Sequence, residues 1–344
     1  MTFTENINSW YSVNKRDLPW RQNKDPYRVW LSEIIMQQTR VEQGMPYFER
    51  FTKAFPTVFD LANASEEEVL TLWQGLGYYS RARNLHAAAQ YVVQEYKGVF
   101  PDRFELLLKL KGVGDYTASA IASICFDEAQ AVLDGNVFRV LSRYFGIETP
   151  IDTSIGHREF RFLAQSLLPK SDFGDYNQAL MDFGSQQCAP KKPNCSNCCL
   201  QPHCVAYATG KQSALPIKKG KTKIQSVVFN YIVFLDEIGR RSLIRKRTEG
   251  IWTNLYEFPL LESKKRLTIH EVQKHIKADF GFDGEPVLYN ETGIIHKLSH
   301  KKIEAYFFIV PIKEQISNLL TLEEIVSYPM PVLLNNFVSK ISNK

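Results

Sequence analysis

The chain has 344 residues, of which 44% are hydrophobic and 23% are charged. This composition excludes a disordered chain and a fibrous one, and the length predicts two globular domains. The net charge of +5 neither favours nor excludes a nucleic-acid partner. The first ten residues lack the pattern of a signal peptide, and charges interrupt every apolar run below membrane-spanning length. We therefore expect a cytoplasmic protein without a membrane segment.

The hydrophobic pattern changes along the chain. Residues 1–209 repeat apolar side chains at three- and four-residue spacing between short Gly, Pro and Asp breaks, which predicts an all-helical domain. Residues 210–226 contain five Lys and no acid, the composition of an exposed linker. Within 227–344, short β-branched and aromatic runs surround one helical pattern at 271–280. The last segment is therefore predicted to form a smaller α+β domain.

Four of the six cysteines are closely spaced, at Cys188, Cys195, Cys198 and Cys204. Clustered thiols in a non-secreted protein more often bind a metal than form disulfides. Structural zinc sites usually pair two CxxC motifs, which this spacing lacks. The spacing favours ligation of one [4Fe–4S] cluster by the four thiols, and four unrelated thiols are the alternative. Cys125 and Cys199 are predicted to lie outside the ligand set.

Gly112 and Gly114 lie between two helical patterns. Glycine readily adopts positive φ, so a tight hairpin here would present backbone N–H groups beside the positive end of the next helix. Such a hairpin can bind the phosphates of a DNA strand without reading its sequence. An ordinary turn between two helices is the alternative.

Two acidic residues have a context suited to catalysis. Glu33 lies in the apolar helical segment 29–36, where burial would raise its pKa towards that of a general acid. A position on a narrow exposed strip is the alternative for Glu33. Asp134 precedes an apolar-periodic helix, so it is equally interpreted as an ordinary N-cap. A carboxylic acid paired with a carboxylate is the usual means of breaking a glycosidic bond.

The order of these motifs resembles that of the endonuclease-III-like DNA glycosylases. The shared motifs are a GVGDYTA hairpin, an LDGNVFRVLSR segment and the four spaced cysteines. The upstream segments VWLSEIIMQQTR and LWQGLGYYSRARNLH are similar to the adenine-specific, MutY-type branch. The resemblance implies an all-α helix-hairpin-helix glycosylase domain with a [4Fe–4S] loop, followed by an α+β Nudix-like domain.

The activity implied by the resemblance is a step of base excision repair. Relatives of this type remove adenine mispaired with 8-oxoguanine, or with guanine, from double-stranded DNA and leave an abasic site. The resemblance thus implies a nucleoid-associated enzyme, and we expect a monomer. Glu33 would protonate adenine, Asp134 would stabilise the cation at C1′, and Asn136 would orient Asp134 or the attacking water.

Tyr116 indicates the type of reaction. Relatives that also cut the DNA backbone place a Lys at this position, where it forms a Schiff base with the sugar. A phenol cannot form that bond. We therefore expect a monofunctional N-glycosylase in which Tyr116 assists Glu33 and Asp134.

The resemblance also implies residues that contact DNA or the base that is flipped out of the helix. They are Arg16, Trp20, Arg21, Gln38, Leu76, Tyr78, Gly112, Gly114, Leu298, Ser299 and His300. Gln38 and Tyr78 would fill the space left by adenine, although core packing is the alternative for Tyr78.

The C-terminal segment departs from two patterns. Relatives carry a Phe-Ser-His loop that inspects 8-oxoguanine, and this chain has Leu298-Ser299-His300. GIWTNLYEFP resembles part of a Nudix domain, but no REx2EE array follows it to bind Mg²⁺. We expect a recognition module without pyrophosphatase activity.

Two other functions fit parts of the sequence. An endonuclease-III-like pyrimidine-lesion glycosylase with lyase activity would need a Lys in place of Tyr116 and would lack the extra domain. A non-catalytic DNA- or protein-binding module would not need both Glu33 and Asp134.

Overall fold

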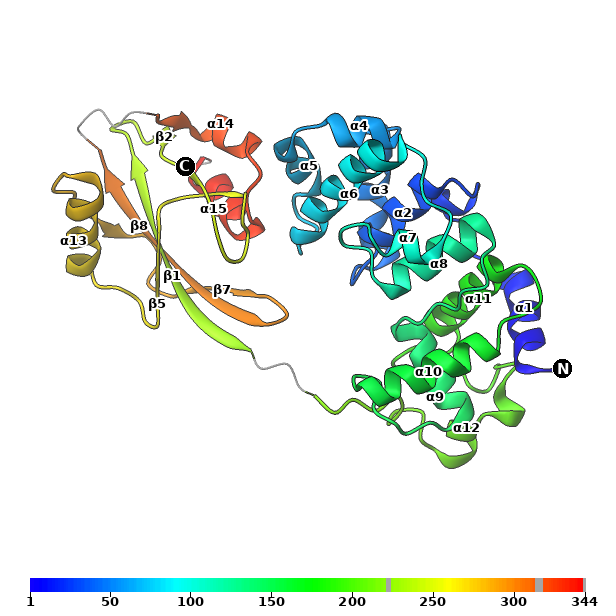
Figure 1. The fold of residues 1–344 in the computed structure, drawn as a ribbon. Coiled ribbons are helices and arrows are strands. Elements are labelled where there is room, and N and C mark those ends of the chain that lie inside the picture. The colour runs from blue at the N-terminus through cyan, green and yellow to red at the C-terminus, as the bar shows by residue number, and fades with distance from the viewer. Residues whose placement is uncertain (221–223, 313–317, 343–344) are drawn as a thin grey trace. The chain divides into compact units, whose positions relative to one another are not determined.

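The computed structural model describes residues 1–220, 224–312 and 318–342 (Figure 1). The chain forms two compact units. The first comprises Met1–Ala64 and Asn84–Lys221, and the second comprises Ser65–Arg83 and Thr222–Lys344. Residues 221–223 of the predicted linker, and 313–317 and 343–344 of the predicted second domain, lie outside the described residues. In the part of the chain that is described, no helix has both the length and the apolar character needed to cross a membrane.

The first unit is built from helices, as the pattern of residues 1–209 predicts. Its longer helices are α1 (Phe3–Asn14), α2 (Pro26–Ile35), α3 (Val41–Ala54), α8 (Asp115–Phe126), α9 (Gly135–Phe145), α10 (Ser154–Ser166) and α11 (Phe173–Gln186). Its short helices are η1 (Pro19–Arg21), α4 (Val58–Asn63), α7 (Phe104–Leu107), η2 (Gln201–His203) and α12 (Val205–Thr209). Helix α6 (Ser80–Tyr96) has its first turn in the second unit and the rest in the first.

Helix α11 packs closely against α8 and the start of α9. A Cβ atom at Gly174 would lie 2.6 Å from Ile124 Cα of α8, and one at Gly184 would lie 2.7 Å from Asn136 Cβ of α9. Both distances are too short for a side chain. The absence of a side chain at these two glycines therefore permits the close approach of the three helices.

A buried asparagine connects α11 to the loop before α9. The Asn177 amide donates to Ser123 Oγ and to the Gln130 carbonyl, both at 2.8 Å. Its Oδ1 accepts from the Val132 N–H at 3.1 Å. Because every polar atom of the Asn177 side chain is hydrogen-bonded, its burial costs little. These bonds fix the loop that leads into Asp134.

Part of the predicted linker is bound to the first unit. Leu215 is buried, and its carbonyl accepts from Arg143 Nε at 3.2 Å. The N–H groups of Lys219 and Gly220 both donate to the Asp152 carboxylate at 2.8 Å. The chain therefore leaves the first unit after these contacts, and strand β1 begins at Gln225.

The second unit is α+β, as predicted for the C-terminal segment. The main sheet has the order β5-β1-β8-β6, with β7 also paired to β8; β1 and β8 run parallel, and the β1–β5, β6–β8 and β7–β8 pairs are antiparallel. Its strands are β1 (Gln225–Leu235), β5 (Leu260–Ser263), β6 (Val287–Leu288), β7 (Ile294–Lys297) and β8 (Lys301–Pro311). Two small sheets pair β2 (Arg241–Ser242) with β9 (Leu320–Thr321), and β3 (Arg245–Lys246) with β4 (Tyr256–Glu257). The helices are α5 (Glu66–Trp73), α13 (Ile269–Phe280), α14 (Leu322–Ser327) and α15 (Val332–Ser342).

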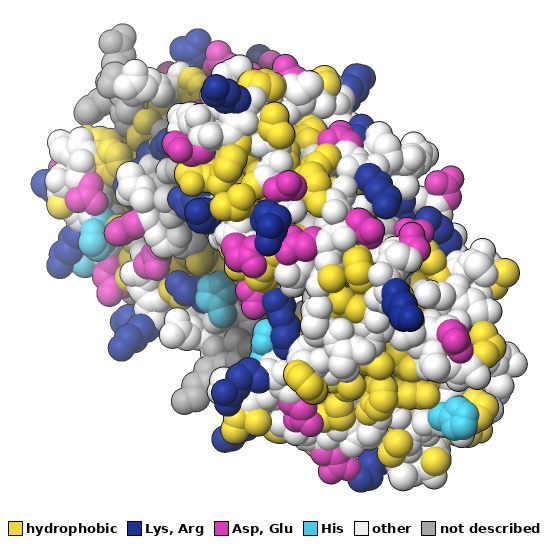
Figure 2. All heavy atoms as spheres, turned by 45° about the vertical axis from the view of Figure 1, so that its right-hand side comes forward, with side chains coloured by type: hydrophobic (Ala, Val, Ile, Leu, Met, Phe, Trp, Pro, Cys, Tyr) yellow, Lys and Arg dark blue, Asp and Glu magenta, His cyan; other side chains and the backbone are white. Residues whose placement is uncertain are grey.

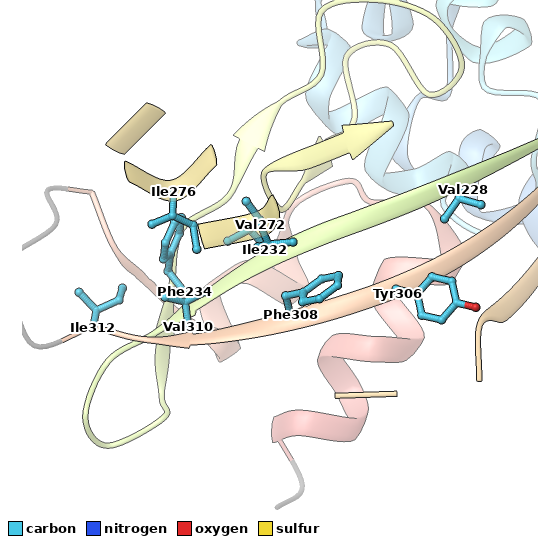
Figure 3. Close-up of a cluster of buried hydrophobic side chains, with 9 residues drawn as sticks. All are labelled: Val228, Ile232, Phe234, Val272, Ile276, Tyr306, Phe308, Val310 and Ile312. Atoms are coloured by element: carbon cyan, nitrogen blue, oxygen red, sulfur yellow. The ribbon is translucent and has the colours of Figure 1, made fainter. Parts of the chain in front are cut away.

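The sheet is covered on both faces because its two long strands are apolar at consecutive positions. On one face, Val272 and Ile276 of α13 pack among alternate residues of β1 and β8, including Ile232 and Phe308 (Figure 3). On the other face, Phe307 of β8 lies between Tyr231 of β1 and Phe337 of α15 in a stack of rings. These two layers form the core of the second unit.

Residues 65–83 belong to the second unit although they lie far from it in the sequence. Tyr256 OH donates to Glu67 at 2.9 Å, and Arg83 donates to the Thr253 carbonyl at 2.8 Å. The Tyr79 hydroxyl donates to the Met330 carbonyl at 3.3 Å. The sequence pattern, which is helical up to residue 209, did not predict this association.

Replacing the buried asparagine tests its role in the fold. We expect Asn177→Ala to lower the free energy of unfolding by about 2 kcal/mol, because three partners, two of them buried, lose their hydrogen bond. Urea denaturation of the full chain measures this loss. The matched control is Asn63→Ala at the exposed end of α4, for which we expect a change within about 0.5 kcal/mol. Equal effects of the two substitutions would contradict the prediction.

Candidate active site

Glu33 lies on the last turns of α2, a helix whose other side chains are mostly buried. Asp25 caps the start of this helix through the Tyr27 N–H, and Pro26 occupies its first turn. Burial of the Glu33 carboxyl raises its pKa from the ordinary value to about 7. A hydrogen bond with Tyr116 and the charge of Arg21 oppose this rise, whereas the charge of Asp134 adds to it. Glu33 is therefore able to hold a proton near neutral pH.

Tyr116 comes from the first turn of α8 and meets Glu33. Burial and the neighbouring carboxylates raise the pKa of its phenol well above the ordinary value, so it stays protonated. Its hydroxyl also contacts Met181 Sδ of α11 at 3.3 Å.

Asp134 is the N-cap of α9, as one of the two sequence interpretations predicts. Its carboxylate accepts from the Asn136 and Val137 N–H groups at 2.8 Å each and from the Asn136 amide at 2.7 Å. Burial raises the pKa of Asp134, and these N–H donors oppose the rise by favouring the charged form. Burial thus acts on both carboxyl groups, but only the Asp134 carboxylate accepts three N–H hydrogen bonds that favour its charged form. Such a difference in surroundings lets paired carboxyl groups take different protonation states.

A small cavity next to Glu33 is lined by residues from four elements. They are Trp20, Arg21, Val29, Glu33, Ile124, Gln178 and Met181. The predicted Trp20 and Arg21 therefore lie beside Glu33. Gln178 and Met181 of α11 were not predicted from the sequence. Gln178 is a polar residue at the start of the apolar helical pattern of 178–188, and Met181 is one of the apolar residues of that pattern, so neither stands out as a site residue.

The predicted Arg16 and Arg21 share one buried carboxylate, that of Asp182, which was not predicted from the sequence. Asp182 of α11 has no exposed side-chain surface. Arg21 donates to it through two nitrogens, at 2.7 and 3.0 Å, and Arg16 donates through Nε at 3.0 Å. Burial by itself would raise the pKa of Asp182, but these hydrogen bonds and charges hold it below the ordinary value. Asp182 is therefore an anion between two guanidinium groups.

The predicted hairpin forms between α7 and α8. Gly112 has φ +82°, a conformation that favours glycine, and the Val113 N–H closes the turn on the Leu110 carbonyl at 3.0 Å. Gly114 is the N-cap of α8, and nothing lies within 4 Å of the position of a Cβ there. The start of α8 thus has open space at the hairpin.

The two residues predicted to fill the space left by adenine share an unusual backbone conformation. Gln38, which follows α2 in the first unit, has φ +55°, and Tyr78 of the second unit has φ +47°. Both side chains are exposed, Tyr78 by 44%. Left-handed backbone at a non-glycine residue is costly and concentrates at functional sites. The neighbouring Leu76 is buried at 5% exposure.

The Leu298-Ser299-His300 segment forms the tight turn between β7 and β8. The Leu298 N–H donates to the Lys301 carbonyl at 2.7 Å, and Ser299 Oγ lies 3.2 Å from His300 Nδ1. Within the second unit these three residues line one cavity together with Leu76 and Tyr78. Trp252 and His296, which the sequence analysis missed, also line this cavity, with ring centroids 5.6 Å apart.

The four predicted cysteine ligands line a single cavity near α9 and α11. Their donor set, four thiols, fits an iron–sulfur cluster, although no three Cys, His, Asp or Glu side chains in the described ranges are arranged as a metal site. Arg143, a buried residue of α9, donates to Cys188 Sγ at 3.4 Å and to the Ala189 carbonyl at 2.9 Å. Cys199 is exposed and is not among the residues that line this cavity.

A second arginine of α9 connects the cysteine loop to the start of the helix. Arg139 donates to the Cys188 carbonyl and to Asn136 Oδ1, both at 2.8 Å.

On the molecular face drawn in Figure 2, basic and acidic side chains are interspersed, in keeping with the small net charge.

Comparison with known proteins identifies both halves of the chain. Residues 31–166 match the family model of the HhH-GPD superfamily base excision DNA repair proteins, and residues 230–340 match that of the NUDIX domain. The predicted fold classes are thereby confirmed. A solved thermostable thymine-DNA glycosylase covers 60% of this chain and 95% of its own, with 30% identity and a TM-score of 0.56. A solved endonuclease III–DNA complex, with 20% identity, a TM-score of 0.53 and coverage of 61% and 95%, supports the fold alone.

Curated relatives extend over most of the chain. The adenine DNA glycosylase of Buchnera aphidicola subsp. Acyrthosiphon pisum is 35% identical over 300 residues, which cover 87% of this chain and 83% of that protein. The adenine DNA glycosylase of Mus musculus is 44% identical over 238 residues, covering 66% of this chain and 46% of that protein. On this evidence the chain belongs to the adenine DNA glycosylase family of base excision repair enzymes.

Proposed function

We propose that this enzyme hydrolyses the N-glycosidic bond of adenine mispaired with 8-oxoguanine or guanine in double-stranded DNA. The observation that supports this reaction best is that Tyr116 is hydrogen-bonded to Glu33 and that the charge of Asp134 acts on both residues. The three residues thus belong to one site. Breaking this bond requires a proton for the departing base and a negative charge near the sugar cation. The site offers a carboxyl group with a pKa of about 7 and a carboxylate held by three N–H donors.

In the proposed mechanism, Glu33 donates its proton to adenine N7. The electron pair of the C1′–N9 bond leaves with the base, and Asp134 stabilises the cation that develops at C1′. Water then adds at C1′ and loses a proton, which leaves an abasic site. Asn136 holds Asp134 through the 2.7 Å hydrogen bond from its amide.

Tyr116 limits the chemistry to base removal. Its phenol stays protonated, and it stands in the sequence where the resemblance implies a Lys in relatives that form a Schiff base with the sugar. The DNA strand is therefore expected to remain uncut after adenine leaves. The hairpin at Gly112 and Gly114 would bind the phosphate backbone through N–H groups at the start of α8.

The four cysteines are proposed to hold one [4Fe–4S] cluster, which when bound would order the loop from Cys188 to Cys204. The chain supplies four soft sulfur donors around one cavity. It also supplies Arg143, whose guanidinium lies beside Cys188 Sγ and can offset negative charge there.

The second unit is proposed to recognise the base opposite adenine. Ser299 and His300 are exposed hydrogen-bonding groups on a tight turn, and they share a cavity with Tyr78. Leu298 replaces the Phe of relatives, so the loop relies on polar contacts to distinguish 8-oxoguanine from guanine.

The pH dependence of adenine release tests the role of Glu33. Because the proton must be on Glu33, the single-turnover rate should be highest at acidic pH and fall as the pH rises through about 7. Glu33→Gln should lower the rate by about a hundredfold or more and remove this decline. The substrate is a duplex with one 8-oxoguanine:A pair, and alkali reveals the abasic sites. No adenine release by the wild type, or strand cutting without alkali, would contradict the proposal.

Two adjacent cysteines offer a matched test of the cluster. We expect Cys198→Ser to lose bound iron and the visible absorption of an iron–sulfur cluster, because one ligand is removed. Cys199→Ser should retain both, since Cys199 is exposed and outside the cavity lining. Iron analysis of the anaerobically purified proteins measures the difference. Equal iron content in the two variants would exclude Cys198 as a ligand.

The turn between β7 and β8 is tested by comparing two mispairs. Substitution of Ser299 and His300 by Ala together should reduce the preference for 8-oxoguanine:A over G:A by about tenfold, as expected for the loss of one or two hydrogen bonds. His275→Ala, at an exposed position of α13, is the control. An unchanged ratio of the two excision rates would remove this turn from recognition.

A further inference from the structure

We propose that Asp182 is a positioning residue that neutralises Arg21 and so allows Glu33 to keep its proton. This inference rests on the proposed role of Glu33 as the general acid. The residues concerned form what we call the Arg16–Arg21–Asp182 cluster.

The geometry of this cluster is that of a buried ion triad. Arg21 presents two nitrogens to the two oxygens of Asp182, the fork arrangement that suits a carboxylate. Arg16 approaches Oδ1 of the same carboxylate through Nε and through a second, shorter contact from Nη2. The side chains of Asp182 and Arg21 are 0% and 9% exposed, whereas that of Arg16 is 30% exposed. Water therefore does little to screen the charges of Asp182 and Arg21.

Arg21 is the positive charge that acts on Glu33. It lines the same small cavity as Glu33, and its charge lowers the pKa of that carboxyl. If Arg21 lacked its counter-ion, its field on Glu33 would be stronger and would favour loss of the catalytic proton. Asp182 therefore offsets the charge of an arginine that lines the cavity next to Glu33.

The remaining groups around Glu33 can be assigned from the elements packed against α2. Helix α8 contributes Tyr116 and Cys125, both neutral because burial raises the pKa of the phenol well above its ordinary value and that of the thiol to about 12. The start of α9 contributes the Asp134 carboxylate, and η1 contributes Arg21. The charged side chains of α3 are all exposed to solvent, namely Glu42, Glu49, Arg50 and Lys53.

Changing the charge of the cluster should move the basic limb of the pH–rate profile. The cluster has two positive charges and one negative charge in the wild type. Asp182→Asn removes the negative charge, so the decline in rate should begin about one pH unit lower. Arg16→Gln removes a positive charge, so the decline should shift in the opposite direction. The double variant restores the net charge, and its decline should return towards that of the wild type.

The experiment measures single-turnover adenine release from the 8-oxoguanine:A duplex across the pH range for each full-length variant. Asp175→Asn is the matched control, because Asp175 is a largely exposed aspartate of the same helix, 3.8 Å from Lys15. Its decline should coincide with that of the wild type. Circular dichroism establishes that each variant is folded. Should Asp182→Asn fail to fold, the more exposed Arg16→Gln variant still provides the shift.

The outcomes separate the two proposals. If the decline disappears in Glu33→Gln but keeps its wild-type position in both Asp182→Asn and Arg16→Gln, the role of Asp182 is overturned and that of Glu33 stands. A uniform loss of rate at every pH in these variants would likewise mean that Asp182 only supports the structure. If Glu33→Gln keeps the decline, Glu33 is not the acid and both proposals fail. Opposite shifts in the two cluster variants support the inference.

Discussion

The candidate active site depends on the close packing of α11 against α8 and the start of α9. Gly174 and Gly184 permit this approach, since a Cβ at either position would overlap a neighbouring helix. The approach brings Met181 to the Tyr116 hydroxyl and lets Asn177 fix the loop before Asp134. Helix α11 thereby links the helix that carries Tyr116 to the helix that Asp134 caps.

The electrostatics of the site follow from this packing. Exclusion of water raises the pKa of Glu33, and the same exclusion would make an unpaired arginine or aspartate very costly. Arg21 and Asp182 are both buried near this site and are paired. The cost of burying the Asp134 carboxylate is lowered differently, because N–H groups at the start of α9 donate hydrogen bonds to it. One dry region thus contains a proton donor, an anion and an ion triad.

The second unit places exposed groups on a rigid support. The turn at Leu298–His300 joins two paired strands, and β8 is held on both faces by the helices α13 and α15. Residues 65–83 bind to this unit through Tyr256, Arg83 and Tyr79. Tyr78 and the turn consequently line one cavity although more than two hundred residues separate them in the sequence. Sites on regular elements hold their side chains more accurately than sites on free loops.

The sequence by itself determined the two fold classes, because helical and strand periodicities depend only on local spacing of apolar residues. It also pointed to Glu33, Asp134, Tyr116 and the four cysteines, whose motifs are short and contiguous. Only the tertiary structure revealed Asp182, Gln178 and Met181, because neither a polar nor an apolar residue within a helical pattern indicates which distant side chain it contacts. The structure alone likewise joined residues 65–83 to the second unit and bound Leu215 of the predicted linker to the first. These features arise from contacts between distant segments, and the spacing of residues along a chain carries no information about such contacts.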